Sequence, residues 1–399
     1  MDIAEVRALL TPAGLELLNS LDPVTSSDEV ARTVSRLRNA GHSPDLVSAV
    51  VTQARLRERA RAKFGDFAAR MLFTRAGLEQ ATRLAVAAHH AGRFQRAGIA
   101  SVADLGCGIG GDALALASLG IRVDAVDADE VTAALATVNL SPFGPSATVR
   151  VGRAEDQDLA DVEAVWLDPA RRTSGHGETG RSRADDWSPS LEWVFDLLGR
   201  MPGGAKLGPG LDRDRIPGGL EAQWVSADGS TVELVLWSGQ LAREGVTRSA
   251  LVLRGQHAAE LTAPADTEDE PVRAIGEFLH EPDGAVIRAR LIGQVARSLR
   301  AGMLSEKVAY LTADEPLTSP FVQTFRVREV LPADTKKLAR ALRERGIGIL
   351  EIKKRGVDVD PAALRQSLRL KGDESATLIM TRIAGARAAI LADRVPPAS

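Results

Sequence analysis

The sequence predicts an α/β protein: a mostly parallel sheet with a closing antiparallel hairpin, preceded by a helical domain and followed by a small α+β domain. Three observations lead to this fold class. From residue 101 onward, short β-branched runs alternate with helical stretches, which is typical of parallel strands joined by crossover helices. Residues 1–98 carry apolar side chains at helical spacing. Residues 286–395 return to alternating strands and helices after a loop-like stretch at 262–285.

Length and composition are those of a soluble globular protein of two or three domains. The chain has 399 residues, 44% of them hydrophobic and 26% charged. No apolar run approaches the roughly 18 residues of a membrane span, and Asp2 and Glu5 stand where a secretory signal would be basic. The single cysteine, Cys107, excludes an internal disulfide, and the six histidines form no ligand-spaced motif. We therefore expect a cytoplasmic protein without a membrane segment or a metal site.

The N-terminal domain, residues 1–98, is expected to be helical. Ser26 precedes two acidic residues in a pattern typical of a helix start. Residues 54–73 mix apolar and basic positions at helical spacing, and their arginines, two residues apart, spread around the helix instead of forming one stripe. Two interpretations stay open for these arginines: a solvated helix surface, or a contact with nucleic acid.

Residues 99–262 carry the predicted sheet domain. Helices are expected at 113–120 and 132–140, between the first strands. Asp228-Gly229 separates two strand-like halves and predicts a hairpin. The strand-like segments in chain order are 101–107, 122–129, 147–156, 164–170, 203–211, 221–239 in two halves, and 249–255.

Residues 286–395 form the third predicted domain, a compact α+β module. Asp334 is expected to cap a helix that Gly346 ends, and Pro361 occupies the first turn of a second helix. The strand-like segments around these helices are 308–312, 321–331, 347–356 and a hairpin at 375–394.

Charge is unevenly distributed along the chain. Residues 286–391 hold 20 lysines and arginines against 11 aspartates and glutamates, whereas the whole chain has a net charge of −3. A basic block on an acidic body predicts a polyanionic partner, with Lys353, Lys354 and Arg355 as candidate contacts. A solvated face on a small domain is the alternative interpretation.

The segment Asp-Leu-Gly-Cys-Gly-Ile-Gly-Gly-Asp at 104–112 is the most informative one. A predicted strand runs into a glycine turn and then a helix, so the backbone can approach a ligand and the helix N-terminus can bind electron-rich atoms. Gly106, Gly108 and Gly111 also fit the G-x-G-x-x-G pattern of dinucleotide sites. Asp127, at the end of the next strand, suits a ribose diol in either case.

Three further features favour a cationic, adenine-containing ligand over a dinucleotide. Asp104 precedes the first glycine by two residues, where it would repel a pyrophosphate but attract the cationic end of an amino acid. Glu155 and Asp156 end the third strand, where acceptors can meet an adenine amino group. Asp168 begins an Asp-Pro-Ala-Arg segment at the end of the fourth strand. Ligands of open α/β sheets bind at the carboxyl ends of strands, so we expect these features to share one crevice.

Over residues 101–170 these motifs resemble class I S-adenosylmethionine-dependent methyltransferases. The resemblance implies a Rossmann-like sheet and S-adenosyl-L-methionine as cofactor. The implied cofactor-binding residues are Asp104, Gly106, Gly108 and Gly110 for the methionine part, Asp127 for the ribose, and Glu155 and Asp156 for the adenine.

Two further likenesses concern the substrate. The Cys-Gly-Ile-Gly-Gly-Asp and Ala-Val-Asp-Ala-Asp motifs, with Asn139, are similar to those of RNA cap guanine-N2 methyltransferases. The chain as a whole resembles a bacterial methyltransferase family with a C-terminal THUMP-like domain, and residues 348–372 carry this likeness. THUMP-type domains imply binding to structured RNA, such as tRNA or rRNA.

In the resemblance to class I methyltransferases, the segment that begins at Asp168 takes the place of the catalytic (N/D)-P-P-(Y/F/W) segment. Asp168 and the carbonyl of Pro169 can hold an acceptor amine and relieve its developing charge. Ala170 and Arg171 stand where a second proline and a base-stacking aromatic residue are expected. Trp187 is then either a substitute platform for a flipped base or a core residue.

Basic residues follow this segment. Arg171 and Arg172 suit a phosphate-bearing substrate, and the alternative is an ion pair with Glu155 or Asp186. His176 lies in the glycine-rich stretch that follows, either as part of a substrate loop or simply as a loop residue.

The sequence therefore predicts methyl transfer to a nucleotide of structured RNA, with Asp168, Pro169 and Arg171 as catalytic residues. Cys107 lies inside the cofactor loop, so we do not expect it to be the covalent nucleophile that uridine C5 methylation needs. One alternative is a methyltransferase of a small metabolite or a protein. Another is a non-catalytic protein that binds RNA or a partner through a degenerate methyltransferase fold, which the departure at Ala170 keeps open.

Overall fold

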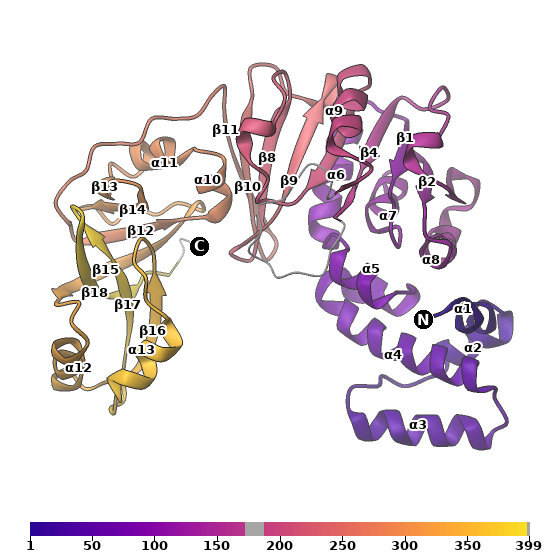
Figure 1. Ribbon diagram of the computed structural model, residues 1–399, viewed down its shortest axis with the longest axis horizontal. Coiled ribbons are helices and arrows are strands. Elements are labelled where there is room, and N and C mark those ends of the chain that lie inside the picture. Colours follow the sequence, from indigo (N-terminus) through magenta and orange to yellow (C-terminus); the bar gives the residue numbers. More distant parts are fainter. Residues whose placement is uncertain (172–186, 397–399) are drawn as a thin grey trace. The chain divides into compact units, whose positions relative to one another are not determined.

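The computed structural model describes residues 1–171 and 187–396, and it divides the chain into two compact units (Figure 1). The first unit comprises Met1–Leu207 and Leu236–Ala242, and the second comprises Gly208–Val235 and Arg243–Ser399. The chain thus leaves the first unit, returns to it for one short segment, and then continues in the second.

The first unit begins with the helices expected for residues 1–98. Side chains of Asp2, Thr11, Ser26 and Ser43 each accept a backbone N–H from the first turn of the helix that follows, as N-caps do. The helices are α1 (Ile3–Leu9), α2 (Pro12–Asn19), α3 (Ser27–Asn39), α4 (Pro44–Phe64), the 3-10 helix η1 (Gly65–Arg70), α5 (Arg75–Gln80) and α6 (Leu84–Arg96). None of the helices that the structure describes is long and apolar enough to cross a bilayer.

A nine-stranded sheet follows along the chain, in the order β11-β10-β8-β9-β7-β4-β1-β2-β3. Of its strands, β8, β10, β11 and most of β9 belong to the second unit. The neighbours from β7 to β3 pair in parallel, as the alternation of strands and helices predicted. The strands are β1 (Ser101–Leu105), β2 (Arg122–Asp127), β3 (Ala147–Val151), β4 (Ala164–Leu167), β7 (Gly203–Leu207), β8 (Glu221–Ala227), β9 (Ser230–Ser238), β10 (Arg248–Arg254) and β11 (His257–Ala263). The connecting helices are α7 (Gly111–Ser118), α8 (Glu130–Leu140) and α9 (Leu191–Arg200), with short 3-10 helices η2 (Ser141–Ser146), η3 (Ala154–Asp156), η5 (Arg213–Arg215) and η6 (Gly239–Leu241).

The hairpin predicted at Asp228-Gly229 is confirmed. Both residues have positive φ, 50° and 81°, as a two-residue turn between twisted strands requires. The neighbouring antiparallel strand β11 was not predicted, and it pairs with β10 along its whole length.

An aromatic core lies between α6 and the sheet. Trp166 of β4 and Trp237 of β9 are fully buried, with ring centroids 5.6 Å apart, and His90 lies 4.6 Å from Trp166. The guanidinium of Arg93 covers Trp237 at 4.5 Å, and its Nε donates to the carbonyl of Leu241 at 2.7 Å. The returning segment Leu236–Ala242 therefore completes the core of the first unit.

The second unit contains a seven-stranded sheet in the order β13-β14-β12-β15-β18-β17-β16. Alternate residues of β17 face two cores, as the period of a strand requires: Leu378 packs with Leu338 under the helices, whereas Ile379 packs with Tyr310 and Phe325. The strands are β12 (Phe278–Pro282), β13 (Gly302–Ser305), β14 (Val308–Ala313), β15 (Val322–Leu331), β16 (Ile347–Lys354), β17 (Glu374–Ile383) and β18 (Ala386–Arg394). The helices are α10 (Gly284–Arg288), α11 (Ile292–Ser298), α12 (Thr335–Glu344) and α13 (Pro361–Leu368).

The stretch at 262–285 is not loop throughout, so that prediction is wrong over Phe278–Pro282. These residues form β12, which lies inside the seven-stranded sheet and pairs with β14 and β15. The prediction for α12 and for the start of α13 is confirmed. Asp334 caps α12, Gly346, with φ of 66°, follows its end, and Pro361 lies in the first turn of α13.

Candidate active site at the carboxyl ends of the parallel strands

The glycine loop between β1 and α7 is shaped by backbone conformations that favour glycine. Gly106, Gly108 and Gly110 have φ of 94°, 56° and 84°. A Cβ added to Gly106 would lie 2.9 Å from the carbonyl oxygen of Asp168. The loop therefore approaches the end of β4 backbone to backbone, and this leaves a cradle into which a larger residue would intrude.

Asp104 lies beneath this loop as a buried, unpartnered carboxyl group. Its exposed fraction is 1%, and neither carboxylate oxygen has a hydrogen-bond partner among the described residues. Burial raises the pKa of Asp104 well above its usual value, and the nearby carboxylates of Asp112 and Asp168 add to this. A buried acceptor of this kind fits a ligand with a positive charge, such as the ammonium or sulfonium of the expected cofactor.

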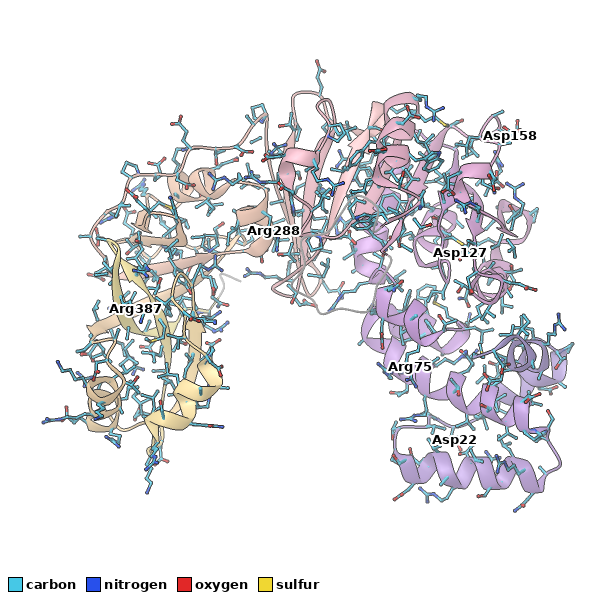
Figure 2. All side chains as sticks on the ribbon, in the orientation of Figure 1. Asp22, Arg75, Asp127, Asp158, Arg288 and Arg387 are labelled. Atoms are coloured by element: carbon cyan, nitrogen blue, oxygen red, sulfur yellow. The ribbon has the colours of Figure 1, made fainter. Side chains whose placement is uncertain are left out.

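Asp127 ends β2 beside the loop (Figure 2). Its two oxygens accept backbone N–H groups of Gly108 and Asp129, both at 2.9 Å, so this carboxylate orders the cofactor loop. Burial raises its pKa, and each oxygen keeps a second lone pair for a ligand hydroxyl. The structure thus brings Asp104, Asp127 and the glycines together, as the sequence predicted from the strand ends.

The expected adenine contacts lie in η3, after β3. Glu155 is half-buried and pairs with Arg153 at 2.9 Å, whereas Asp156 is exposed. The ion-pair partner of Glu155 among the described residues is thus its near neighbour in sequence. The side chain of Arg171 and all of Arg172, His176 and Asp186 lie outside the described residues.

A charged network that sequence reasoning missed surrounds Asp168. Lys206 of β7 is buried, and its Nζ lies 2.6 Å from a carboxylate oxygen of Asp168 and donates to the hydroxyl of Thr82 at 2.8 Å. Thr82 in turn donates to Asp112 at 2.8 Å, and His90 Nδ1 lies 3.0 Å from the other oxygen of Asp112. Although burial acts to raise the pKa of Asp112, His90 and Lys206 lower it to about 2.

The two carboxylates of this network, Asp112 and Asp168, differ in their exposure to solvent. The side chain of Asp168 is 35% exposed and that of Asp112 is 10% exposed. Only Asp168 of the two is open enough to meet an incoming acceptor group. A lone lysine in the small, apolar strand Gly203–Leu207 was the available signal for Lys206, because polar residues at strand ends of such sheets face the ligand crevice.

Asn139 of α8 ties the cofactor loop to the N-terminal helices. Its Oδ1 accepts the backbone N–H of Leu72 at 2.7 Å, and its Nδ2 donates to the carbonyls of Leu72 at 3.0 Å and Ile109 at 2.8 Å. Cys107 packs locally, with its thiol 3.5 Å from the carbonyl of Gly108, and burial raises its pKa well above the usual value. A protonated, enclosed thiol does not serve as a nucleophile.

The end of β4 continues into a short ladder. Ala170–Arg171 forms β5, which pairs antiparallel with β6, Trp187–Ser188, so that Trp187 lies opposite Arg171. Trp187 is 7% exposed, which favours its interpretation as a core residue over that of a stacking platform. Among the described residues, no group of three His, Cys, Asp or Glu side chains is placed to hold a metal ion.

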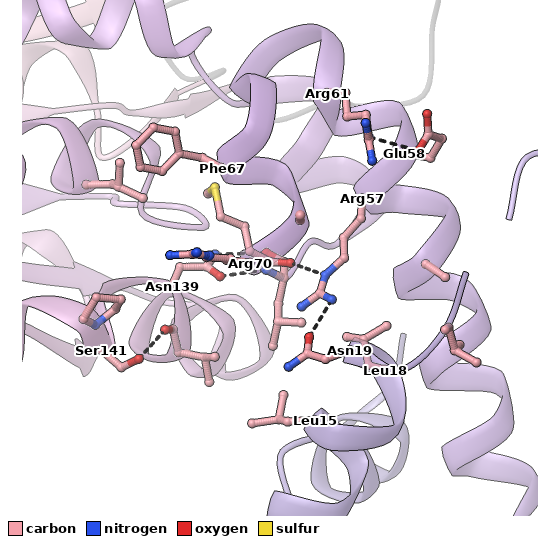
Figure 3. Close-up of a pocket in the computed structure, with 18 of the residues that line it drawn as sticks. Leu15, Leu18, Asn19, Arg57, Glu58, Arg61, Phe67, Arg70, Asn139 and Ser141 are labelled. Carbon is pink, nitrogen blue, oxygen red and sulfur yellow. Dashed lines mark hydrogen bonds and ion pairs between the residues drawn. The ribbon is translucent and has the colours of Figure 1, made fainter. Parts of the chain in front are cut away.

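A cavity of about 610 Å³ lies among the N-terminal helices of the first unit and beside Asn139 (Figure 3). Arg57 lines it and donates to the carbonyl of Met71 and to Oδ1 of Asn19, both at 2.9 Å. Burial lowers the pKa of Arg57 to about 10. Because this arginine is held by neutral oxygens inside the fold, it joins helices rather than forming part of a solvated surface.

Comparison with known proteins identifies the family. Over 357 residues, the chain is 33% identical to proteins of two Mycobacterium tuberculosis strains, CDC 1551 / Oshkosh and ATCC 25618 / H37Rv. The match covers 87% of this chain and 95% of each relative, and both are named uncharacterized S-adenosylmethionine-dependent methyltransferases. The chain belongs to the S-adenosylmethionine-dependent methyltransferases.

Other comparisons concern the fold and the two ends of the chain. A solved structure of a proposed methyltransferase from Porphyromonas gingivalis W83 is similar over 93% of this methyltransferase and 99% of that chain, with a TM-score of 0.69 and 20% identity. Residues 322–394 match a THUMP domain-like family, and residues 2–60 match a domain of unknown function, DUF8688. The enzyme uses S-adenosylmethionine, which sets aside the dinucleotide interpretation of its glycine loop.

Proposed function

We propose that this methyltransferase transfers a methyl group to a nucleotide of structured RNA, such as tRNA or rRNA. The observation that carries the proposal is the THUMP domain-like match at residues 322–394, which overlaps the basic block at 286–391 over residues 322–391. THUMP-type domains are associated with RNA, and a block with excess positive charge suits a polyanion. On this proposal, the C-terminal module of residues 286–395 holds the RNA and the strand ends of the first unit modify it.

The proposed cofactor-binding residues lie at three strand ends, and each strand end binds a different part of the ligand. Asp104 faces the positive charge of the methionine part, and the loop of Gly106, Gly108 and Gly110 admits it at close range. Asp127 takes the ribose hydroxyls, and η3 with Glu155 and Asp156 lies on the adenine side. The cofactor supplies a methyl group that its sulfonium charge already activates, so the protein has mainly to position the acceptor.

Asp168 is proposed to hold that acceptor. Its carboxylate is fixed by Lys206 at 2.6 Å and remains partly open to solvent. Together with the carbonyl of Pro169 it can accept two hydrogen bonds from an amino group and stabilise the positive charge that develops as the methyl bond forms. Arg171, which follows in the chain, is proposed to contact a phosphate of the same RNA.

Methyl incorporation tests this proposal. Purified enzyme and tritiated S-adenosylmethionine are incubated with total RNA from a strain that lacks the gene, beside metabolite and protein extracts of that strain. We expect incorporation into RNA. Asp168→Ala should lower turnover about a hundredfold, the cost of removing one preorganised transition-state contact, and leave cofactor affinity nearly unchanged.

The matched control is Asp158→Ala, which removes an exposed aspartate of the loop before β4. It should leave turnover at the wild-type level. Incorporation only into metabolite or protein extract would replace RNA by another acceptor class. Full activity of Asp168→Ala would place the acceptor away from the end of β4.

A further inference from the structure

A groove of about 620 Å³ on the C-terminal module is lined by residues on the side of α12 and α13 of the second unit. Figure 1 labels these two helices. Both helices turn their leucines inward: Leu338 and Leu342 of α12, and Leu364 and Leu368 of α13, pack on the sheet. The groove that remains between the helices is polar. It is lined by Thr335, Lys336, Ala339 and Arg343 from α12, and by Ala363, Gln366, Ser367 and Arg369 from the side of α13.

All the charged side chains that line this groove are positive. Lys336, Arg343 and Arg369 line it, and its lining contains no acidic residue. Among the residues that the structure describes, none of these three side chains forms an ion pair. Lys336 and Arg343 are exposed and seven residues apart, so they lie on one face of α12, two turns from each other.

Other cations of the same module are already compensated. Lys353 and Arg355 of the predicted contact region both pair with Glu281, at 2.7 and 3.4 Å, and they lie over the rings of Phe325 and Tyr310. On α12 itself, Arg340 pairs with Glu344 one turn away, at 2.7 Å. Of the predicted contacts at residues 353–355, Lys353 and Arg355 are therefore compensated. Lys336, Arg343 and Arg369 form no ion pair among the described residues and line one groove together.

The lining also says which part of a nucleic acid fits. Guanidinium and ammonium groups bind phosphate oxygens, and hydroxyl and amide groups such as those of Ser367 and Gln366 can bond to phosphates and to the ribose 2′-hydroxyl. Proteins that recognise unpaired bases commonly stack them on aromatic side chains. The groove contains no aromatic side chain, and its apolar lining consists of Ala339 and Ala363.

We propose that the groove between α12 and α13 binds the sugar–phosphate backbone of the RNA, and that it does so without reading base sequence. The proposal rests on the proposed function, because it names the surface by which the module would hold the RNA substrate. It moves the main contact from Lys353, Lys354 and Arg355 to Lys336, Arg343 and Arg369.

The test is the salt dependence of RNA binding by the full chain. The probes are two fluorescently labelled RNA hairpins of equal length and unrelated sequence. The groove variant is Lys336→Gln/Arg343→Gln. Loss of two phosphate contacts should reduce the slope of log affinity against log salt by about 1.4 to 1.8, since each contact contributes roughly 0.7 to 0.9. Both hairpins should give the same reduction.

The matched control is Lys337→Gln/Arg340→Gln. It removes two positive charges from the same helix, but neither residue lines the groove. Its slope should stay within about 0.4 of the wild-type slope. That is less than half of the change expected from the loss of two phosphate contacts. Titration of S-adenosylhomocysteine should give wild-type affinity for both variants, which shows that the cofactor unit is intact.

Each of the other outcomes of this binding test would contradict a specific part of the proposal. Equal slope changes in the two variants would mean that only net charge matters and the groove is not the contact. The wild-type chain could bind both hairpins while the groove variant keeps the wild-type salt slope. The RNA would then bind elsewhere on the chain, and the proposed function would not be contradicted. A strong preference of the wild type for one hairpin, lost in the groove variant, would show base reading. No binding of either hairpin by the wild type would remove both the groove and the RNA substrate.

Discussion

Asp104 shows how a proposed binding residue can weaken the fold that carries it. Its pKa lies well above the usual value because the carboxyl group is buried without a partner. An acid whose pKa rises on folding binds its proton more tightly in the folded chain. Its contribution to stability is therefore complete at low pH, below the unfolded pKa, and is lost as the pH rises through the folded pKa.

Asp104→Asn removes this titration while nearly preserving shape. We expect the cofactor-free variant to melt at a higher temperature than the wild type near pH 8, with a difference that shrinks as the pH falls toward about 4. The same variant should bind S-adenosylhomocysteine more weakly, because the partner of the positive charge is gone. Thermal unfolding across this pH range and calorimetric titration measure the two effects. A difference in melting temperature that does not vary with pH would contradict the assignment.

At the same scale, the sequence allowed some site residues to be predicted and hid others. Asp104, Asp127 and Asp168 lie at the carboxyl ends of strands that share one edge of the sheet, so spacing along the chain was enough to bring them together. Lys206 was missed because its role depends on Asp168 and on Thr82, which lies more than a hundred residues away in sequence. The lone lysine in an apolar strand marks the position as unusual, but the local sequence does not encode its partners.

At the scale of elements, Asn139 joins three segments through one side chain: α8, the stretch between η1 and α5, and the cofactor loop. Asn139→Ala would leave three buried backbone groups unpaired, two of Leu72 and one of Ile109. Each such group costs about 1–3 kcal/mol, so we expect the free energy of unfolding to fall by about 3 kcal/mol or more. Cofactor affinity should fall as well, since Ile109 belongs to the loop.

Urea denaturation and titration of S-adenosylhomocysteine measure both quantities. Ser141→Ala serves as the comparison, because it removes an exposed hydroxyl whose one partner among the described residues is the carbonyl of Val138 at the end of the same helix. It should change stability by less than about 0.5 kcal/mol. Equal losses in the two variants would mean that Asn139 does not act through the segments it joins.

The elements that sequence reasoning found are those with local signals. Asp334 and Gly346 marked the two ends of α12, and Pro361 marked the start of α13, because caps and turns are encoded by residues next to one another. The strands β11 and β12 were missed. Phe278–Pro282 is five residues long and contains a proline and a glutamate, and it becomes a strand through pairing with residues far downstream.

At the scale of the whole molecule, the two proposed tasks fall in different units. The strand ends with Asp104, Asp127 and Asp168 belong to the first unit, and the groove between α12 and α13 belongs to the second. Hydrogen exchange can therefore separate them. S-adenosylhomocysteine should slow amide exchange in the glycine loop and β2, whereas a bound RNA hairpin should slow it in α12 and α13. Protection of α12 by the cofactor product alone would contradict this division of tasks.

The order of parts along the chain was predictable at this scale, but the path of the chain was not. Charge and periodicity indicated a helical part, an α/β sheet and a basic module in sequence. The return of Leu236–Ala242 to the first unit depends on Trp237 packing with Trp166 and on the bond from Arg93 to Leu241. These are contacts between residues 71 to 148 positions apart, which short-range patterns do not reveal.

That return has a consequence for synthesis on the ribosome. Domains that are continuous in sequence can fold as soon as their last residue emerges. Here the methyl-transferring unit cannot close its tryptophan core at Leu207, because Trp237 has not yet been translated. The nascent chain must first extend through Gly208–Val235, which belongs to the other unit. The second unit is thus begun before the first is finished, and no single cut of the polypeptide separates the two intact.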